Sequence, residues 1–338
     1  MVVEPPAAHP RGVRVGAGDA GRLEAATREF RALDYRHGGG SCRDAAQILL
    51  PYAELMLVGV VPEAVIPRLC TAVADLYNLA GWASFDDGRP GAALAAFGRA
   101  LELARTAGND ELVANVCYRM GRLYLHYDAA EEALNQFERG QAAARRTDSA
   151  LARAILSANL AWAEARRGDA AAALALLHAA RDEFAAASPV AAPPWAAFFG
   201  ETDLAAMIGT VHVELARSVD VRYARSAIDR LVVAVDGYGP AMARSRSLTQ
   251  IWLATAHALA GDVDQAAHVA GTAVGTAAEL RSERTKQRLS PLAAAFARYP
   301  GNADARDVLE RIDRLRGIAG TGTVTHRGVN AAQGKTLE

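Results

Sequence analysis

Residues 77–100 read YNLAGWASFDDGRPGAALAAFGRA, and the same arrangement of small, large and turn-forming residues returns twice at a spacing of 40 residues. A fixed period of this kind, without a single insertion, is typical of stacked helical hairpins. Such a solenoid offers an extended concave surface, which is usually a binding surface. Five repeat positions have the same type of residue in all three units, in the order small, turn-forming, small, large and small. They are Gly81, Gly121 and Ala161; Gly88, Asp128 and Gly168; Ala93, Ala133 and Ala173; Phe97, Phe137 and Leu177; and Ala100, Gly140 and Ala180.

The composition favours an all-α chain. Of the 338 residues 51% are apolar and only 6% aromatic, which suits close helix–helix packing better than a sandwich or barrel. The only β-branched run, residues 231–235, lies inside a longer helical period. A net charge of −1 provides no global field that would attract nucleic acid or an anionic membrane.

Other sequence features argue against export, a membrane span and a zinc site. The most apolar run, residues 49–66, is interrupted by prolines and glutamates, so it is not expected to cross a membrane. The chain begins without the charged and apolar regions of a signal peptide. Cys42, Cys70 and Cys117 lack CxxC spacing, so neither a disulfide framework nor a zinc site is expected. We therefore expect a cytoplasmic protein.

Composition also divides the chain. Residues 1–18 are rich in Pro, Gly and Ala and are expected to form a disordered leader. Residues 19–317 are expected to form the solenoid, and residues 318–338 a disordered tail. The proline-rich stretch 188–195 is expected to interrupt the array and to act as a hinge.

The repeats resemble the tetratricopeptide (TPR) motif. In that motif the first helix carries a large residue, a Leu-Gly-like pair, a second large residue and a small turn residue, and the second helix carries Ala, an aromatic residue and Ala. The TPR period is about 34 residues, so the longer period here implies longer helices or turns. The resemblance implies an all-α, TPR-like α-solenoid of roughly seven helical hairpins, wound into a right-handed superhelix with a concave groove. The unit that carries it best consists of Cys117, Met120-Gly121, Tyr124, Asp128, Ala133 and Phe137.

A second resemblance covers roughly residues 20–300. The segments 22–25, 30–40, 42–44, 79–82, 85–86 and 118–122 resemble the sensor half of actinobacterial helix-turn-helix transcriptional regulators of the XRE type. In those relatives a DNA-binding domain precedes the sensor half, whereas here only about twenty low-complexity residues precede it. The resemblance implies a module that senses a ligand or partner, and it disfavours direct binding of nucleic acid.

The candidate groove residues follow from the TPR resemblance, because in that fold the first helix of each hairpin lines the concave face. Asparagines there suit the backbone of an extended peptide. Arg122 and Arg166 suit a carboxylate, and Trp82 and Trp162 supply rigid apolar area. The alternative is that the tryptophans pack between hairpins and the polar groups are only solvated. The candidates are Asn78, Trp82, Phe85, Asn115, Tyr118, Arg122, His126, Asn159, Trp162 and Arg166.

A second polar cluster surrounds Gly38-Gly39-Gly40. Glycines permit unusual backbone angles and the close approach of another group, so neighbouring polar side chains could bind an anion or perform acid–base chemistry. The alternative is that the glycines end one helix and a capping box starts the next. The candidate residues are Asp34, Arg36, His37, Cys42, Arg43 and Asp44.

No further motif indicates chemistry. Four other histidines are isolated within expected helices, and neither HExxH, GxGxxG, GxxxxGK[ST] nor GxSxG occurs, so we expect no metal site and no cofactor. The run RSERTKQR, residues 281–288, is interpreted as a basic, solvated helix face.

The function that these patterns favour is a non-catalytic regulatory binding module whose groove takes a peptide, a small-molecule effector or a helix of a partner protein. One alternative is a scaffold that only docks other proteins or forms a homodimer through its terminal hairpins. A second alternative is an enzyme with a pocket built by the His37–Cys42 loop and the groove. The sequence favours binding over catalysis.

Overall fold

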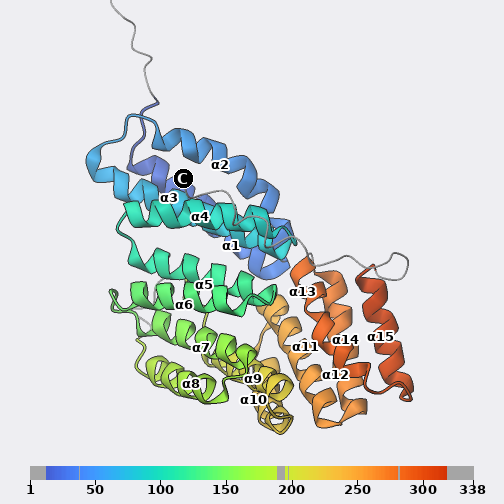
Figure 1. Ribbon diagram of the computed structural model, residues 1–338. Helices are drawn as coiled ribbons and strands as arrows, with labels where there is room; N and C mark the ends of the chain where they lie inside the picture. Colours follow the sequence, from blue (N-terminus) through green and yellow to red (C-terminus); the bar gives the residue numbers. More distant parts are fainter. Residues whose placement is uncertain (1–12, 38, 189–194, 197, 281, 318–338) are drawn as a thin grey trace, which may run out of the picture.

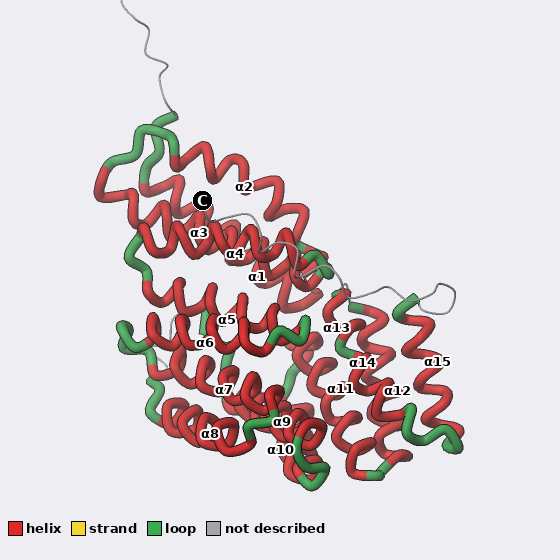
Figure 2. The backbone as a smooth tube through the Cα atoms, viewed as in Figure 1, coloured by secondary structure: helices red, strands yellow, loops and turns green. Residues whose placement is uncertain are grey.

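The structure, a computed structural model, describes residues 13–37, 39–188, 195–196, 198–280 and 282–317, and its regular elements are helices (Figures 1 and 2). Among these residues, three short 3₁₀ segments, η1 (Gly39–Ser41), η2 (Glu63–Val65) and η4 (Pro240–Met242), accompany the α-helices. These are α1 (Ala17–His37), α2 (Arg43–Leu57), α3 (Ile66–Asp86), α4 (Pro90–Thr106), α5 (Asp110–His126), α6 (Ala130–Ala144), α7 (Ala150–Arg167), α8 (Ala170–Ala185), α9 (Glu201–Ser218), α10 (Tyr223–Gly237), α11 (Ala243–Ala260), α12 (Val263–Glu279), α13 (Glu283–Gln287), α14 (Leu289–Phe296) and α15 (Ala303–Leu315).

Consecutive helices pack as hairpins that stack on one another. The pairs are α3 with α4, α5 with α6, α7 with α8, α9 with α10, and α11 with α12. At one end α1 and α2 pack on α3, and at the other α14 and α15 pack on α11 and α12. The expected all-α, TPR-like α-solenoid is confirmed.

The 40-residue period places a small residue opposite a large one in each hairpin. A Cβ atom on Gly81 would lie 2.7 Å from Cδ1 of Phe97, and the ring of Phe137 covers Gly121 in the same way. In the third unit the same two positions hold Ala161 and the smaller Leu177, both of them buried. The turn position is equally consistent, because Gly88, Asp128 and Gly168 all have positive φ. The residues that recur every 40 positions are therefore those at which the two helices of a hairpin touch and those at which the chain turns between the helices.

Replacement of Gly81 by Ala is expected to lower the free energy of unfolding by about 1–3 kcal/mol, because the added methyl group collides with the buried ring of Phe97. The matched control is Gly98→Ala in α4, where nothing lies within 4 Å of the new Cβ. That change is expected to stabilise the protein by up to about 1 kcal/mol, since alanine is the better helix former. Urea unfolding of both variants measures the difference, and equal stabilities would contradict this account of the repeat.

The fold begins earlier than the expected leader, residues 1–18, would allow. The backbone N–H of Val15 donates to the carbonyl of Val60 at 3.1 Å, the N–H of Val60 donates to the carbonyl of Val13 at 2.9 Å, and α1 starts at Ala17. Residues 1–12 and 318–338 of the expected leader and tail lie outside the described residues. So does most of the expected interruption at residues 188–195. On either side of that interruption, α7 and α9 pack directly together, so the stack continues.

The array curves back so that α1 and α3 reach α11 and α13, and we call this meeting the end contact. Helix α11 lies beside α1, and α13 lies beside α3, although these helices are about 200 residues apart in the sequence (Figure 1). The groove of the first hairpins is therefore faced by helices from the second half. Among the helices that the structure describes, none has the length and apolar character needed to span a membrane.

Candidate functional site

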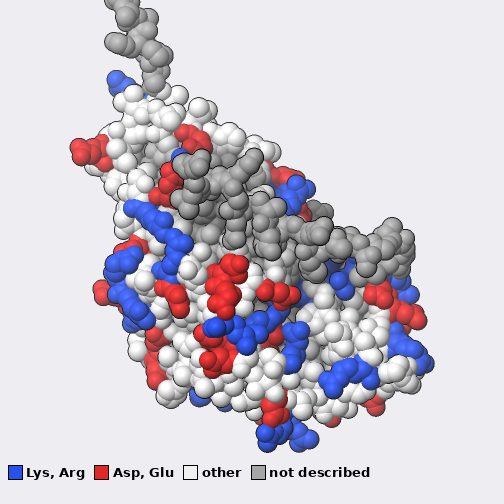
Figure 3. Space-filling model, viewed as in Figure 1, with Lys and Arg blue, Asp and Glu red and all other residues white. Residues whose placement is uncertain are grey.

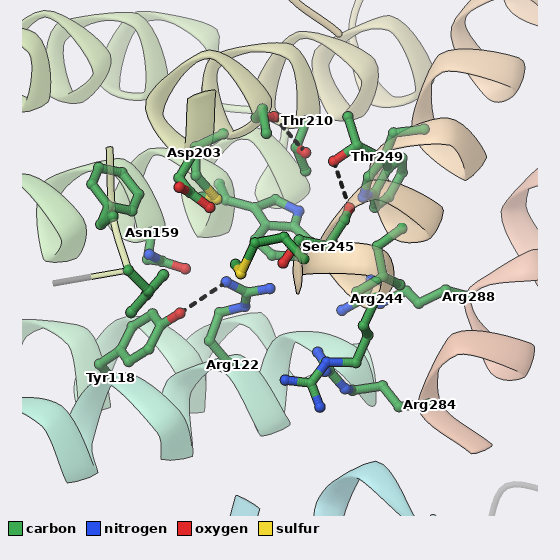
Figure 4. A pocket seen from close by; sticks show the side chains of 18 of the residues that line it. Tyr118, Arg122, Asn159, Asp203, Thr210, Arg244, Ser245, Thr249, Arg284 and Arg288 are labelled. Atoms are coloured by element: carbon green, nitrogen blue, oxygen red, sulfur yellow. Dashed lines mark hydrogen bonds between the residues drawn. The ribbon is translucent and has the colours of Figure 1, made fainter. Parts of the chain in front are cut away.

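A pocket lies between the two halves of the array, with a cavity of about 140 Å³. This is space for about ten water molecules. Figure 4 shows side chains from α5, α7, α9 and α11 converging on it, with Arg284 of α13 and Arg288, which follows α13, at one side. Its lining consists of Trp82, Asn115, Tyr118, Arg119, Arg122, Asn159, Trp162, Phe198, Phe199, Asp203, Ala206, Met207, Thr210, Tyr238, Met242, Arg244, Ser245, Leu248, Thr249, Trp252, Arg284 and Arg288.

One position of the 40-residue period builds the wall of this pocket. Trp82, Arg122 and Trp162 occupy it in successive hairpins, and all three line the cavity. The guanidinium of Arg122 lies 4.8 Å from the centroid of the Trp162 ring, and that of Arg119 lies 5.2 Å from the ring of Trp82. The repeat thus alternates aromatic and cationic side chains along the inner face.

The position one helical turn later joins the two halves. Asp86 accepts a hydrogen bond from Arg284 at 2.9 Å, Arg166 donates to Glu214 at 2.6 Å, and Nε2 of His126 lies 2.6 Å from Oε1 of Gln287. Burial lowers the pKa of His126 well below 6.5, so its ring is neutral and donates from Nε2. We call the row formed by Asp86, His126 and Arg166 the seam.

The seam ends in a buried network of charges near α1. Arg244 donates to both carboxylate oxygens of Asp34, at 2.7 and 3.0 Å, and also lies 3.6 Å from Asp86. Asp86 is fully buried and additionally accepts from the backbone N–H of Gly39 at 2.8 Å. Although burial opposes its ionisation, Arg244 and Arg284 hold the pKa of Asp86 below its ordinary value. The network stabilises the contact between the ends of the array.

Three tryptophans hold cationic groups at the pocket. Arg288 lies 5.0 Å from the ring centroid of Trp162 and 5.9 Å from that of Trp252, and Arg284 lies 4.8 Å from that of Trp82. Arg284 has a carboxylate partner in Asp86. Arg288 has neither an ion pair nor a side-chain hydrogen bond within the described part of the chain, and it is 8% exposed. Guanidinium groups on aromatic faces keep their N–H edges available for a further partner.

Five apolar side chains also line the pocket, and we call them the apolar wall. They are Phe198 and Phe199, which precede α9, Met207 of α9, Met242 of η4 and Leu248 of α11. Asp203 of α9 is the acidic residue of the lining.

Asp203 accepts hydrogen bonds from the hydroxyl of Tyr238 at 2.8 Å and from the N–H of Gly200 at 3.2 Å. Burial raises the pKa of Asp203. The Asp203 oxygens are therefore engaged by its own helix start and by Tyr238.

Six of the ten candidate groove residues line the cavity, and four lie behind it or at the seam. Asn78 is fully buried and donates to the side chain of Asn115, while Phe85 packs edge-on against Trp82 with centroids 5.5 Å apart. His126 and Arg166 lie at the seam. Arg166 is engaged by Glu214 and Asp128. The six that line the cavity are Trp82, Asn115, Tyr118, Arg122, Asn159 and Trp162.

The second predicted cluster separates into structural contacts. Asp34 is held by Arg244, and Arg43 contacts Asp87 and Asp44. Burial and the nearby Asp34 raise the pKa of Cys42 to about 12, so its thiol stays protonated and is no nucleophile. His37 is exposed, and the side chain of Arg36 lies outside the described residues. The loop contributes to the end contact through Gly39.

The second half of the lining was missed by the sequence analysis. The run at residues 281–288 was interpreted as a solvated basic face, but Arg284 is 3% exposed and points to the pocket with Arg288. Arg284 lies in α13 and Arg288 directly follows it, so their spacing of about one helical turn was the available signal. Trp252, which falls in a later unit with TPR-like residues, was a second signal. Nothing in the sequence alone showed that the array would close on itself.

Comparisons with known proteins define the fold. No family model and no curated protein matches the sequence. Among solved structures, the chain is similar to a Rap protein, crystallised as a complex with Competence and Sporulation Factor. The sequences are 13% identical, the match covers 89% of this chain and 94% of the Rap chain, and the TM-score is 0.50. At this identity the similarity establishes the TPR-like helical architecture.

Proposed function

We propose that this protein is a non-catalytic regulatory binding module that takes a small-molecule effector or a short peptide in the pocket between its two halves. The observation that carries this proposal is the pocket itself. It combines a cavity, convergent polar groups and aromatic walls, which is the usual composition of a ligand site. The complex of the similar Rap protein with Competence and Sporulation Factor agrees with this use of the fold.

The asparagines support a ligand with amide or carboxyl groups. Asn159 is 1% exposed, and its Nδ2 donates to the carbonyl of Ile155 at 2.7 Å. Its Oδ1 is buried without a hydrogen-bond donor among the described residues. An unsatisfied buried acceptor costs free energy, and a ligand donor beside Asn159 would remove that cost.

Regulation follows from the position of the pocket between two parts of the array, which meet through the seam, through the packing of α7 on α9 and through the contact of Arg244 with Asp34. Its walls come from α3, α5 and α7 on one side and from α9, α11 and α13 on the other. A ligand that contacts both sides binds the closed arrangement more tightly than a more open one. It therefore shifts the population toward the closed arrangement, by an amount set by the difference between the two affinities. A partner protein that distinguishes these arrangements would then receive the signal. The sensor-like resemblance of the sequence remains a prediction.

The proposal is tested by filling the cavity. We expect that compounds from a library of metabolites and short peptides raise the melting temperature of the wild-type protein. Ala206→Phe is expected to abolish this response, because Ala206 lines the cavity and a phenyl ring would occupy it. Ala95→Phe, on the exposed side of α4, is the matched control and is expected to respond like wild type.

A response that survives in Ala206→Phe would contradict binding in this pocket. Absence of any response in the wild type would favour the scaffold alternative. That alternative has its own support in α2, whose exposed side carries Ile48, Tyr52 and Leu55 and would suit a second copy of this chain.

We infer that the protein acts in the cytoplasm without contacting nucleic acid directly. On the face seen in Figure 3, acidic and basic side chains are intermixed over the hairpins, and neither sign forms a continuous field. The net charge of −1 agrees with this inference.

A further inference from the structure

We propose that the ligand of this pocket is an oxyanion, a carboxylate or a phosphate, attached to an apolar body, and that Arg122 and Arg288 hold its charged group. This inference rests on the proposed function and adds the chemical class of the ligand. It follows from the charges, the aromatic contacts and the two unlike walls of the pocket.

The positive charge at the pocket exceeds the negative charge that faces it. Arg119, Arg122, Arg244, Arg284 and Arg288 line the cavity, and Asp203 is its acidic residue. Behind the wall, Asp34 and Asp86 compensate Arg244 and Arg284. Within the described residues, no carboxylate forms an ion pair with Arg122 or Arg288. Arg119 donates to the backbone carbonyl of Asn78 at 2.9 Å. Arg122 and Arg288 are therefore the two lining arginines that we assign to a ligand.

The protein has placed Arg288 where its charge is unfavourable. Burial, together with the neighbouring Arg122 and Arg166, lowers the pKa of Arg288 well below its ordinary value. The nearby Glu214 opposes this effect, but its carboxylate is paired with Arg166 and Arg217. A guanidinium remains protonated in proteins. The unfavourable surroundings therefore raise the free energy of the charged Arg288 side chain instead of removing its proton. Isolated buried charges are rare because they are costly, and those that occur are paired. A bound anion would supply the missing partner.

The side chains of Arg122 and Arg288 are oriented by contacts with uncharged groups, and these contacts leave N–H donors available for a ligand. Arg122 donates to the hydroxyl of Tyr118 at 3.2 Å and lies over Trp162. Arg288 lies near the same Trp162 ring and near Trp252. Because aromatic contacts use the faces of the guanidinium, the N–H edges can donate in pairs to carboxylate or phosphate oxygens.

The apolar wall specifies the rest of the ligand. Phe198, Phe199, Met207, Met242 and Leu248 contribute area that a free inorganic ion would leave unused. The cavity of about 140 Å³ suits a body of on the order of ten non-hydrogen atoms. An oxyanion beside the arginines, with an aromatic or aliphatic group against Phe199 and Met207, uses both walls.

The test is a thermal-shift screen of matched pairs. Aromatic and aliphatic carboxylic acids are paired with their primary amides, and phosphate monoesters with their parent alcohols. We expect the anionic member of some pairs to raise the melting temperature and its neutral partner to have no effect. Hits among the acids alone identify a carboxylate, and hits among the esters alone identify a phosphate.

The affinity of an anionic hit is expected to fall at least about tenfold in Arg122→Gln and in Arg288→Gln. Arg181→Gln, on the exposed side of α8, is the control and is expected to bind normally.

The outcomes separate the two proposals. Neutral members that bind as well as anionic ones, and lose binding in Ala206→Phe, would overturn the oxyanion inference and leave the pocket as a binding site. No binding by any member would overturn the oxyanion inference, while the screen of metabolites and short peptides decides the proposed function separately. Independently of any ligand, Arg288→Met is expected to raise the melting temperature of the free protein by about 2 °C or more, since it removes an unpaired buried charge. A lower melting temperature for Arg288→Met would show that Arg288 serves stability, and would overturn its assignment to the ligand.

Discussion

Replacement of Asp86 by Asn is expected to lower the free energy of unfolding by about 3–5 kcal/mol, which is among the largest effects of any single polar substitution in this protein. Asp86 lies fully buried between Arg284, 2.9 Å away, and Arg244. Its loss leaves Arg284 without a carboxylate partner. Chemical denaturation followed by circular dichroism measures the change. Asp87→Asn, at the next position and partly exposed, is a control with an expected effect below about 1 kcal/mol.

The contribution of Asp86 also has a definite pH dependence. The pKa of Asp86 in the folded protein is lowered below 3.8, so the unfolded chain binds its proton more readily. The stabilisation is therefore complete above about pH 4 and decreases as the pH falls through the folded pKa. Wild type and Asp86→Asn should converge in stability as the pH is lowered below 4. A difference that stays constant over this range would contradict the charged state of Asp86.

Replacement of Glu214 by Gln is the second large change, with an expected loss of about 3–5 kcal/mol. The carboxylate of Glu214 is 2% exposed and accepts from Arg166 at 2.6 Å, from Arg217 at 2.8 Å and from the indole Nε1 of Trp162 at 3.3 Å. The change removes the buried one of the two ion-pair partners of Arg166 and loosens a pocket tryptophan. We therefore expect both lower stability and a shifted tryptophan emission. Glu164→Gln, which removes only a partly exposed pair with Arg167, is the matched control.

If Glu214→Gln lowered stability without altering tryptophan emission, the seam would be independent of the pocket. That result would remove the physical basis for transmitting ligand binding to the contact between the two halves.

The double variant Asp86→Asn/Glu214→Gln tests whether the two contacts depend on each other. Both residues join the first hairpins to the second half, so a combined loss that differs from the sum of the single losses would show that the two seam contacts are coupled.

The sequence allowed the hairpins and the first half of the site to be predicted, because both depend on local periodicity. The spacing of 40 residues identified Gly81 and Phe97 as a packed pair and Gly88 as a turn. The same spacing placed Trp82, Arg122 and Trp162 on one face. A helical repeat records such contacts at fixed intervals, since each unit touches its neighbours in the same way.

The remaining part of the site depends on contacts between residues that are far apart in the chain. Arg244 meets Asp34 across 210 positions, and Arg284 meets Asp86 across 198. The curvature that brings them together is the sum of small rotations between hairpins, which no motif encodes. For this reason Arg166 and His126 were expected in the groove but lie at the seam, and Arg288 was expected on a solvated face but lies at the pocket.

The central claim is that an accessible pocket of net positive charge lies beside the tryptophans. Trp82, Trp162 and Trp252 line it, and Trp195, the fourth, stacks on Tyr118 with ring centroids 6.3 Å apart. The most direct measurement is therefore the quenching of tryptophan fluorescence by iodide and by caesium at equal ionic strength. The account predicts that iodide quenches several-fold more strongly than caesium, and that the preference falls in the double variant Arg122→Gln/Arg288→Gln. Quenching by caesium equal to or stronger than that by iodide would contradict it.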